Sequence, residues 1–353
     1  MGRSIKLFLL VCLTSCFSGK DMQHIEKIPV PKASSDELFD SRLRIFAPKE
    51  NTVLLLLPLS GNNESVGRGI LNACLLASGN IKNIDFHVLD TADRGKHVAP
   101  RYLRHKNFAA IIGPIFFQEV AQYGALLPHV PILSFSNNLK INNGHIFACG
   151  LSPEDEIHAL FAYADSQQIK SFLVMLPDGE LGNQIQDIIR CELKKYGVEE
   201  GDDLEILRYS SISRKAATKY ANNSNKKAIF VINPIINISK LENAQVFTLS
   251  SAALSPGDAW EGVIFAFSDN PEQREFIEKY HAVFGVQPSV LDMVGHDLVK
   301  VVKESINYEH PIVQNLYFGC LGEFLIDKQN GLRRKLSIYR RTDSGKEELS
   351  CTN

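Results

Sequence analysis

The chain has 353 residues, which is enough for about two ordinary domains, since domain sizes cluster near 100–150 residues. Its composition, 44% hydrophobic and 22% charged, is typical of a globular protein that folds in water, and excludes a disordered chain or one with many membrane spans. The 38 Lys and Arg against 40 Asp and Glu give a formal charge of -2. Without the basic excess that phosphate backbones attract, a nucleic-acid partner is not expected.

The first sixteen residues have the pattern of a secretory signal. Arg3 and Lys6 precede the apolar run 7–13, which is far shorter than the ~20 residues that a helix needs to cross a bilayer. The run ends in Leu13-Thr14-Ser15-Cys16, which resembles a bacterial lipobox, in which the cysteine is acylated and becomes the first mature residue. Phe17 follows, where an aspartate would signal inner-membrane retention. We therefore expect a lipid anchor at Cys16 on the periplasmic face of the outer membrane; the alternative is an ordinary signal peptide with a chance cysteine.

Of the seven cysteines, two lie in the signal and its lipobox. The remaining five contain no CxxC pair and no metal-type spacing, so no metal site is expected. Cys74 and Cys191 are expected to be buried small apolar residues on helices. A disulfide between two of Cys149, Cys320 and Cys351 stays open, because the sequence cannot choose the pair.

Residues 17–50 mix charges with Pro29 and Pro31 and show little periodicity, which predicts a tether, with a short helix at 35–46. Folding is expected to begin at the apolar run 52–57. Such a continuous run is typical of a strand that is buried on both faces of a parallel sheet.

Strands and helices then alternate along the chain. The expected strands are 84–89, 108–112, 130–135, 171–176, 204–207, 227–232, 246–249 and 262–266. The expected helices lie near 66–77, 99–105, 117–127, 153–164, 181–193, 272–284 and 289–306, with one short helix within 210–226. This alternation predicts an α/β protein with parallel, doubly wound sheets. Residues 323–327 and 333–339 alternate across the turn 328–331 like a hairpin, and the chain beyond Arg340 is expected to be frayed.

Five segments resemble a known family. Residues 54–61, with Gly67, Gly69 and Ala73 after them, look like the opening of the Leu/Ile/Val-type binding proteins and, more narrowly, of the penicillin-binding protein activator group of lipoproteins. The other segments follow in that group's order: 112–116, 132–137, 176–178 with Gly182, and 319–324 leading to Asp327 and 331–334. The ordered set, spread over 52–340, carries the resemblance, since no single segment is specific.

The resemblance implies the two-lobed type I periplasmic binding protein fold, in which each lobe is a mostly parallel doubly wound sheet. The chain would cross between lobes three times, near 149–152, 266–269 and 317–322. The implied parts are 1–16, signal peptide with lipobox; 17–50, tether; 51–148 and 270–316, lobe one; 149–269 and 317–340, lobe two; and 341–353, a frayed tail. Ligands of open α/β sheets bind at the carboxyl ends of the strands.

The loops at those strand ends hold the candidate binding residues: Ser60, Gly61, Gly113, Phe116, Phe117, Ser134, Ser136, Asn137 and Asp178. In amino-acid-binding relatives, the corresponding hydroxyls and free N–H groups hold a carboxylate. This sequence keeps Ser134 and Ser136, but it has Phe116 and Phe117 where those relatives carry small hydroxyl residues. That departure weakens the interpretation as an amino-acid site.

Each candidate also has a structural interpretation. Hydroxyls and glycines in such loops commonly serve turns, and Asp178 could serve as the N-cap of the helix that starts near Leu181. Phe116, Phe117 and Trp260 could anchor a protein partner, since aromatic side chains often do, but burial in the core is the expected fate, above all for Phe117.

Enzyme signatures are absent from the sequence. There is no G-x-S-x-G, no H-E-x-x-H, no P-loop and no closely spaced set of glycines after the first strand. We therefore expect no catalytic residue, no cofactor and no metal. The resemblance implies a non-enzymatic regulator or scaffold of a peptidoglycan synthase, attached to the membrane by its lipid. The alternative is an amino-acid or small-solute-binding protein of an ABC importer.

Overall fold

The computed structural model describes residues 51–79, 84–92, 101–233, 235–241, 243–253, 260–308, 311–313, 315–327, 329 and 331–349. The expected signal peptide, the lipobox with Cys16, the tether and its short helix lie outside the described residues. Contacts divide the described chain into two units. Lobe one holds 51–151 and 269–335, and lobe two holds 152–268 and 336–349.

Lobe one is built on a parallel sheet with the strand order β2-β1-β3-β4-β5. Its strands are β1 (Thr52–Leu57), β2 (Asp85–Asp90), β3 (Ala110–Ile112), β4 (Ile132–Ser134) and β5 (Ile146–Ala148). All six residues of β1 are buried, which explains its continuous apolar run. Strand β5 was not anticipated, because three residues between turns are too few to show a period.

The helices of lobe one are α3 (Glu64–Ser78), α4 (Phe117–Leu126), α9 (Pro271–Phe284) and α10 (Val290–Tyr308), with 3-10 turns η1 (Gly61–Asn63), η2 (Arg101–His105) and η3 (Leu139–Ile141). Residues 101–105 of the expected helix 99–105 thus form a 3-10 turn.

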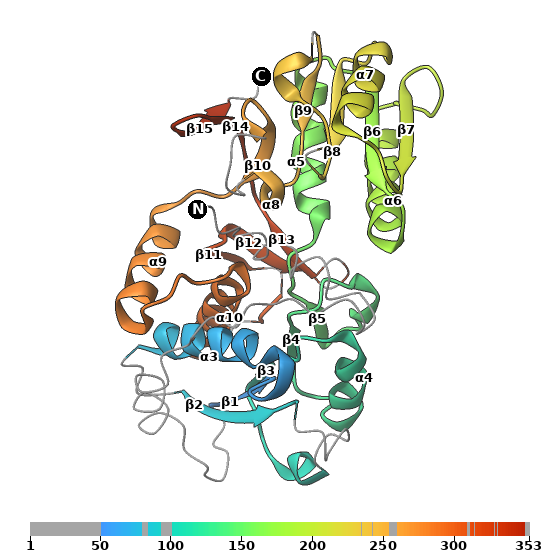
Figure 1. Cartoon of the computed structure of the whole chain (residues 1–353). Coiled ribbons are helices and arrows are strands. Elements are labelled where there is room, and N and C mark those ends of the chain that lie inside the picture. Colours follow the sequence, from blue (N-terminus) through green and yellow to red (C-terminus); the bar gives the residue numbers. More distant parts are fainter. Residues whose placement is uncertain are drawn as a thin grey trace. The chain divides into compact units, whose positions relative to one another are not determined.

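Helices α3 and α10 lie side by side (Figure 1), although they are far apart in the sequence. Glycines permit this close approach. A Cβ atom at Gly69 would lie 2.7 Å from Asp292 Oδ1, and one at Gly295 would lie 2.9 Å from Ile70 Cγ2. The thiol of Cys74, buried as expected, donates a hydrogen bond to the Gly295 carbonyl oxygen at 3.6 Å.

The third crossing differs from the expected one near 317–322. A small antiparallel sheet, with the order β11-β12-β13, stays in lobe one. Its strands are β11 (Leu316–Gly319), β12 (Gly322–Asp327) and β13 (Gly331–Arg334). Phe324, Ile326 and Leu332 of this sheet are buried in the same core as Leu55 and Ile70, so apolar burial holds 317–335 in lobe one.

Lobe two contains a seven-stranded sheet with the order β15-β14-β10-β9-β8-β6-β7. The strands β6 (Phe172–Pro177), β7 (Leu204–Tyr209), β8 (Ala228–Val231), β9 (Gln245–Phe247) and β10 (Ile264–Phe267) are parallel, whereas β14 (Ser337–Thr342) and β15 (Gly345–Leu349) are antiparallel. The expected single strand 333–339 is therefore wrong, because 331–334 and 337–342 belong to different sheets.

The frayed tail expected for 341–353 is also wrong over 341–349. Strand β14 pairs with β15 across a turn at Asp343-Ser344, and with β10 on its other side. Ile338 and Tyr339 are buried in this arrangement. Their burial attaches the hairpin to the sheet, so polar residues after Arg340 do not imply fraying here.

The helices of lobe two are α5 (Pro153–Ser166), α6 (Glu180–Lys195), α7 (Arg214–Asn223) and α8 (Ser250–Ala253), with the 3-10 turn η4 (Ile238–Lys240). The start expected for α5 is confirmed: Ser152 Oγ accepts a hydrogen bond from the Glu154 backbone N–H at 3.2 Å, and Pro153 follows the cap. Trp260 is buried in the core of this lobe, as expected.

The burial expected for Cys191 is wrong, because this residue is exposed on α6. The inward stripe of α6 consists of Ile185, Ile189 and Leu193, which leaves position 191 on the outer face. All described cysteines are free thiols, including Cys149 and Cys320. Within the described part of the chain, no helix is both long enough and apolar enough to span a membrane.

Helix α10 begins with a buried carboxyl group. Asp292 Oδ2 accepts a hydrogen bond from the Ser289 backbone N–H at 2.6 Å, and Ser289 Oγ accepts one from the Asp292 N–H at 3.3 Å. This reciprocal pair is a capping box. Burial raises the pKa of Asp292 to about 7 despite these hydrogen bonds, and its Oδ1 atom has no hydrogen-bond partner among the described residues.

We predict that Asp292→Asn removes part of the pH dependence of stability. The folded pKa lies above the unfolded value, so the folded state binds more protons between about pH 4 and pH 7, and stability falls as the pH rises through that window. From pH 5 to pH 8 the variant should lose about 2–3 kcal/mol less of its free energy of unfolding than the wild type.

Urea unfolding at the two pH values measures this difference. Asp187→Asn, at an exposed position on α6, is the matched control and should follow the wild type. An equally steep loss in Asp292→Asn and in the wild type would contradict the assignment to Asp292.

Candidate functional site

Most candidate residues lie at one edge of the lobe-one sheet. Strands β1, β3 and β4 are neighbours, so the loops that follow them, 58–61, 113–117 and 135–138, leave from the same carboxyl edge. Asp178 follows β6 and belongs to lobe two. We treat this edge of lobe one as the candidate site.

Ser60 holds the loop after β1 to the end of β2. Asp90 Oδ1 accepts hydrogen bonds from the backbone N–H groups of Leu59 at 2.8 Å and Ala92 at 2.9 Å. Burial alone would raise the pKa of Asp90, but the Ser60 hydroxyl and the surrounding backbone N–H groups outweigh it and lower that pKa. The hydroxyl of Ser60 therefore serves the loop and stabilises a carboxylate.

The two candidate glycines differ in their surroundings. Gly113 has a φ of +105°, and a Cβ atom there would lie 2.2 Å from the Leu56 carbonyl oxygen. Its N–H donates to the Leu133 carbonyl oxygen at 2.9 Å. Gly61 also has a positive φ, +74°, but a Cβ atom there would meet nothing within 4 Å. Gly113 is thus required by the close approach of two strands, and Gly61 by its turn alone.

The candidate serines are hydrogen-bonded to backbone groups of the loops after β3 and β4. Ser134 Oγ donates to the Pro114 carbonyl oxygen at 2.8 Å and accepts from the Ser136 N–H at 3.1 Å. Ser136 Oγ accepts from the Asn138 N–H at 3.1 Å. Ser134, Ser136 and Asn137 are all buried. The turn chemistry expected as the structural interpretation accounts for both hydroxyls.

The two candidate phenylalanines differ in exposure. Phe116 is half-buried against the core of lobe one. Phe117, the first residue of α4, is 38% exposed, so the core burial expected for it is wrong. Its place in the first turn puts it at the edge where β3 has already ended, while the buried face of α4 begins with Val120.

Asp178 does not cap α6. The N-cap is Gly179, with no side-chain hydrogen bond to the helix, so the expected capping role is wrong. Asp178 is exposed and forms an ion pair with Arg208, with 3.7 Å between Oδ1 and Nε. Arg208 Nη2 also donates to Asn183 Oδ1 at 2.8 Å and to the Gly179 carbonyl oxygen at 3.4 Å. The guanidinium group therefore holds both this aspartate and the loop before α6.

The sequence interpretation missed Thr91 and Glu119 at the same edge. Thr91 directly follows β2, and Glu119 lies in the first turn of α4. Burial raises the pKa of Glu119 to about 7, while the Thr91 hydroxyl acts in the opposite direction. Glu119 Oε2 has no hydrogen-bond partner among the described residues. The polar pair Asp90-Thr91 after an expected strand was the available signal.

The electrostatics of this edge do not suit a bound carboxylate. Asp90, whose pKa is lowered, brings a negative charge to it, and like charges repel. The hydroxyls that could bind a carboxylate, those of Ser60, Ser134 and Ser136, have partners within the chain. The candidate site thus offers an exposed aromatic ring beside internally bonded polar groups.

Comparisons with known proteins show which proteins the chain is similar to. A model of the family described as "LppC putative lipoprotein" matches residues 39–205. The penicillin-binding protein activator LpoA of Histophilus somni (strain 129Pt) is 24% identical over 279 residues, covering 70% of this chain and 47% of the relative. LpoA of Mannheimia succiniciproducens is 21% identical over 290 residues, covering 78% and 48%. The chain resembles the penicillin-binding protein activator group. The resemblance inferred from the ordered motifs is confirmed.

Solved structures show the same fold. The "LpoA (YraM) C-domain from Haemophilus influenzae, a regulator of PBP1A" has a TM-score of 0.65 at 18% identity, covering 85% of this chain and 100% of that chain. A "putative branched-chain amino acid ABC transporter" from Rhodospirillum rubrum has a TM-score of 0.71 at 17% identity, covering 86% and 100%. The protein has the α/β fold of the type I periplasmic binding proteins, as expected. It spans about half the length of the curated activators it matches.

We predict that Gly113→Ala destabilises the protein more than Gly61→Ala. The Cβ atom at position 113 meets the Leu56 backbone, whereas the one at position 61 meets open space, and both substitutions carry the cost of a positive φ. The expected losses in free energy of unfolding are about 2–4 kcal/mol and about 1 kcal/mol. Urea unfolding measures both, and equal losses would contradict the close approach of β1 to this loop.

Proposed function

We propose that the chain is a non-enzymatic lipoprotein that regulates a peptidoglycan synthase, and that Phe117 anchors this partner. The observation that carries the proposal is the exposed Phe117 ring at the carboxyl edge of the lobe-one sheet. Relatives that are named penicillin-binding protein activators support the class of partner.

The surroundings of Phe117 fit a protein anchor. Phe116, directly before it, packs on the core and holds the backbone in place, so that Phe117 is presented from the first turn of a helix. A large aromatic side chain on a rigid element gives much contact area at little entropic cost, which is why aromatic residues dominate binding energy at interfaces.

The proposal includes a lipid anchor at Cys16 on the periplasmic face of the outer membrane, with 17–50 as the tether. The family description as a lipoprotein supports the anchor. One acyl chain binds a membrane only marginally, whereas the two or three chains of a bacterial lipoprotein hold firmly. Fractionation of cells that produce Cys16→Ala is the direct check: the variant should leave the membrane fraction, and a variant that stays there would count against lipidation.

We predict that Phe117→Ala weakens stimulation of a class A penicillin-binding protein from the same bacterium. With labelled lipid-linked precursor, the wild-type chain should increase the rate of glycan polymerisation or cross-linking. Loss of a central aromatic anchor costs about 2 kcal/mol or more, so the variant should need about thirty times more protein for half-maximal stimulation.

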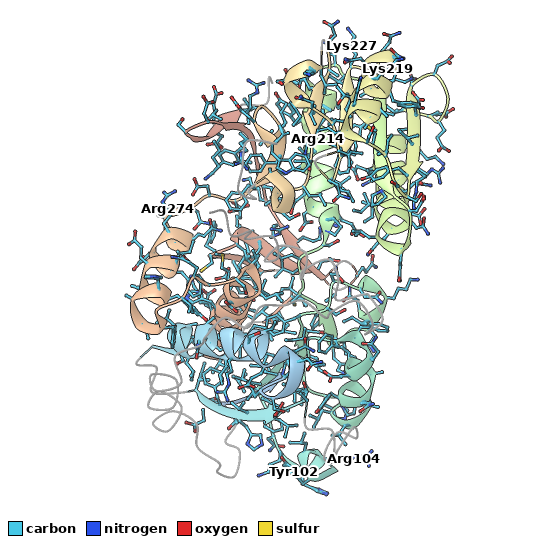
Figure 2. The ribbon with its side chains drawn as sticks, in the orientation of Figure 1. Tyr102, Arg104, Arg214, Lys219, Lys227 and Arg274 are labelled. Carbon is cyan, nitrogen blue, oxygen red and sulfur yellow. The ribbon has the colours of Figure 1, made fainter. Side chains whose placement is uncertain are left out.

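Tyr102→Ala is the matched control for this test. Tyr102 is a second exposed aromatic residue of lobe one, 49% exposed on η2 (Figure 2), and it belongs to none of the strand-end loops of the candidate site, so its loss should leave stimulation unchanged. If Phe117→Ala reaches half-maximal stimulation at the same protein concentration as the wild type, Phe117 is not part of the interface. A wild-type chain without effect on any such synthase would sink the proposal itself.

The solute-capture alternative predicts a different result. A specific ligand at one hundred times its dissociation constant stabilises a protein by about 2.7 kcal/mol, which is readily seen as a rise in melting temperature. Because Ser134 and Ser136 already bond backbone groups of the chain, we expect no shift with amino acids or peptidoglycan fragments. A clear shift with one compound that disappears in Ser134→Ala would favour the importer class instead.

A further inference from the structure

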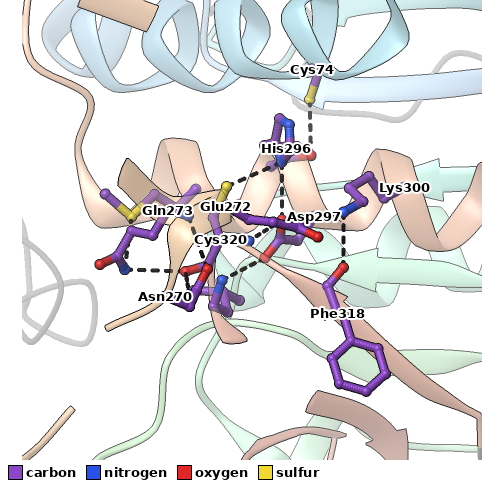
Figure 3. Close-up of polar contacts among 12 residues, drawn as sticks. Cys74, Asn270, Glu272, Gln273, His296, Asp297, Lys300, Phe318 and Cys320 are labelled. Carbon is purple, nitrogen blue, oxygen red and sulfur yellow. Dashed lines mark hydrogen bonds and ion pairs between the residues drawn. The ribbon is translucent and has the colours of Figure 1, made fainter. Parts of the chain in front are cut away.

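We propose that His296, Asp297 and Cys320 form a zinc site in lobe one. His296 and Asp297 are consecutive residues of α10, and Cys320 lies in the turn between β11 and β12 (Figure 3). Their ligand atoms all lie within 4.8 Å of one another. Among the described residues, this is the one group of three histidine, cysteine or acidic side chains whose donor atoms converge so closely.

The donor distances fit a tetrahedral ion. His296 Nδ1 lies 3.3 Å from Cys320 Sγ and 3.0 Å from Asp297 Oδ1. Zinc bonds of 2.0–2.3 Å at tetrahedral angles place neighbouring donor atoms about 3.3–3.7 Å apart. The two distances from His296 Nδ1 therefore need to lengthen by only a few tenths of an ångström, and the third pair lies within 4.8 Å.

The types of donor select the ion. Thiolate, imidazole and carboxylate are the ligands that Zn²⁺ uses in proteins, whereas Ca²⁺ and Mg²⁺ require oxygen donors almost exclusively. Three protein ligands leave the fourth tetrahedral position for water or another group. The set thus favours Zn²⁺ over the hard divalent ions.

One ring nitrogen faces both other groups, which argues against a catalytic relay. In a nucleophile–histidine–carboxylate triad the nucleophile and the carboxylate bond opposite nitrogens of the ring. Here Nδ1 contacts both Cys320 Sγ and Asp297 Oδ1. A single nitrogen can donate to the carboxylate or accept from the thiol, but not both at once. Without a cation, the Cys320 thiol also hydrogen-bonds Asp297. A cation that displaces the thiol proton would contact all three groups together.

Neighbouring groups hold the carboxylate in place. Asp297 is fully buried, its Oδ1 accepts from the Cys320 N–H at 2.9 Å, and its Oδ2 accepts from the Leu321 N–H at 2.8 Å. A Cβ atom at Gly319 would lie 2.3 Å from Asp297 Oδ1, so only glycine fits there. Such outer hydrogen bonds orient metal ligands and raise their affinity.

The histidine provides the route of entry. The ring of His296 packs on Phe276, with 4.7 Å between centroids, and its side chain keeps 17% exposure while the other two ligands are buried.

Cobalt substitution of the purified, reduced full-length chain tests the site. Co²⁺ should produce a thiolate-to-cobalt charge-transfer band, and an equimolar amount of Zn²⁺ should remove it. Cys320→Ser should abolish the band and weaken Zn²⁺ binding at least tenfold, and His296→Gln should weaken it comparably. Cys191→Ser removes an exposed thiol outside the cluster and should leave band and affinity unchanged.

The outcomes are decisive in both directions. X-ray absorption of the zinc-loaded wild type should show one sulfur ligand, a result that does not depend on whether a variant folds. Circular dichroism shows whether a variant is misfolded. For such a variant, the X-ray absorption spectrum of the wild type replaces the mutational test. A spectrum with nitrogen and oxygen ligands only, no cobalt band in the wild type, or a band lost in Cys191→Ser but kept in Cys320→Ser would each overturn the proposal.

Discussion

The packing of α10 on α3 is the contact on which lobe one depends. It joins the segment after residue 269 to the first βα unit, and it is possible only because Gly69 and Gly295 let the two backbones approach. The same approach buries Asp292 and brings α10 into place beside the β11–β12 turn. The core of the lobe, the cap of α10 and the cluster around Cys320 are therefore consequences of one helix–helix contact.

The order of elements was predictable from the sequence, but the third crossing between lobes was not. Buried strands such as 52–57 and capped helices such as α5 carry local signals, in their apolar runs and first-turn residues. The position of 317–335 depends on which distant core buries Phe324 and Ile326. Whether the residues from Arg340 onwards form a strand depends on the edge of β10 with which β14 pairs. Contacts between residues so far apart in the sequence produce no local periodicity from which they could be predicted.

The candidate site shows the same division. The sequence located the strand-end loops correctly within the fold, since the carboxyl ends of parallel strands follow from the alternation of elements. It could not show that Ser134 bonds Pro114, that Asp178 pairs with Arg208 and does not cap α6, or that Phe117 is exposed. Each of these depends on a partner distant in the sequence or on where a neighbouring strand ends.

The antiparallel strand β14 also affects how the chain matures. It pairs along β10 and is supplied by residues 337–342, which follow β10 by some seventy residues. Until those residues arrive, β10 is an open edge with unpaired backbone groups, and such edges recruit other strands. A chain that emerges from synthesis or export with its N-terminus first can therefore complete lobe two only after β14 has emerged. Truncation shortly before residue 337 would leave a sheet prone to aggregation.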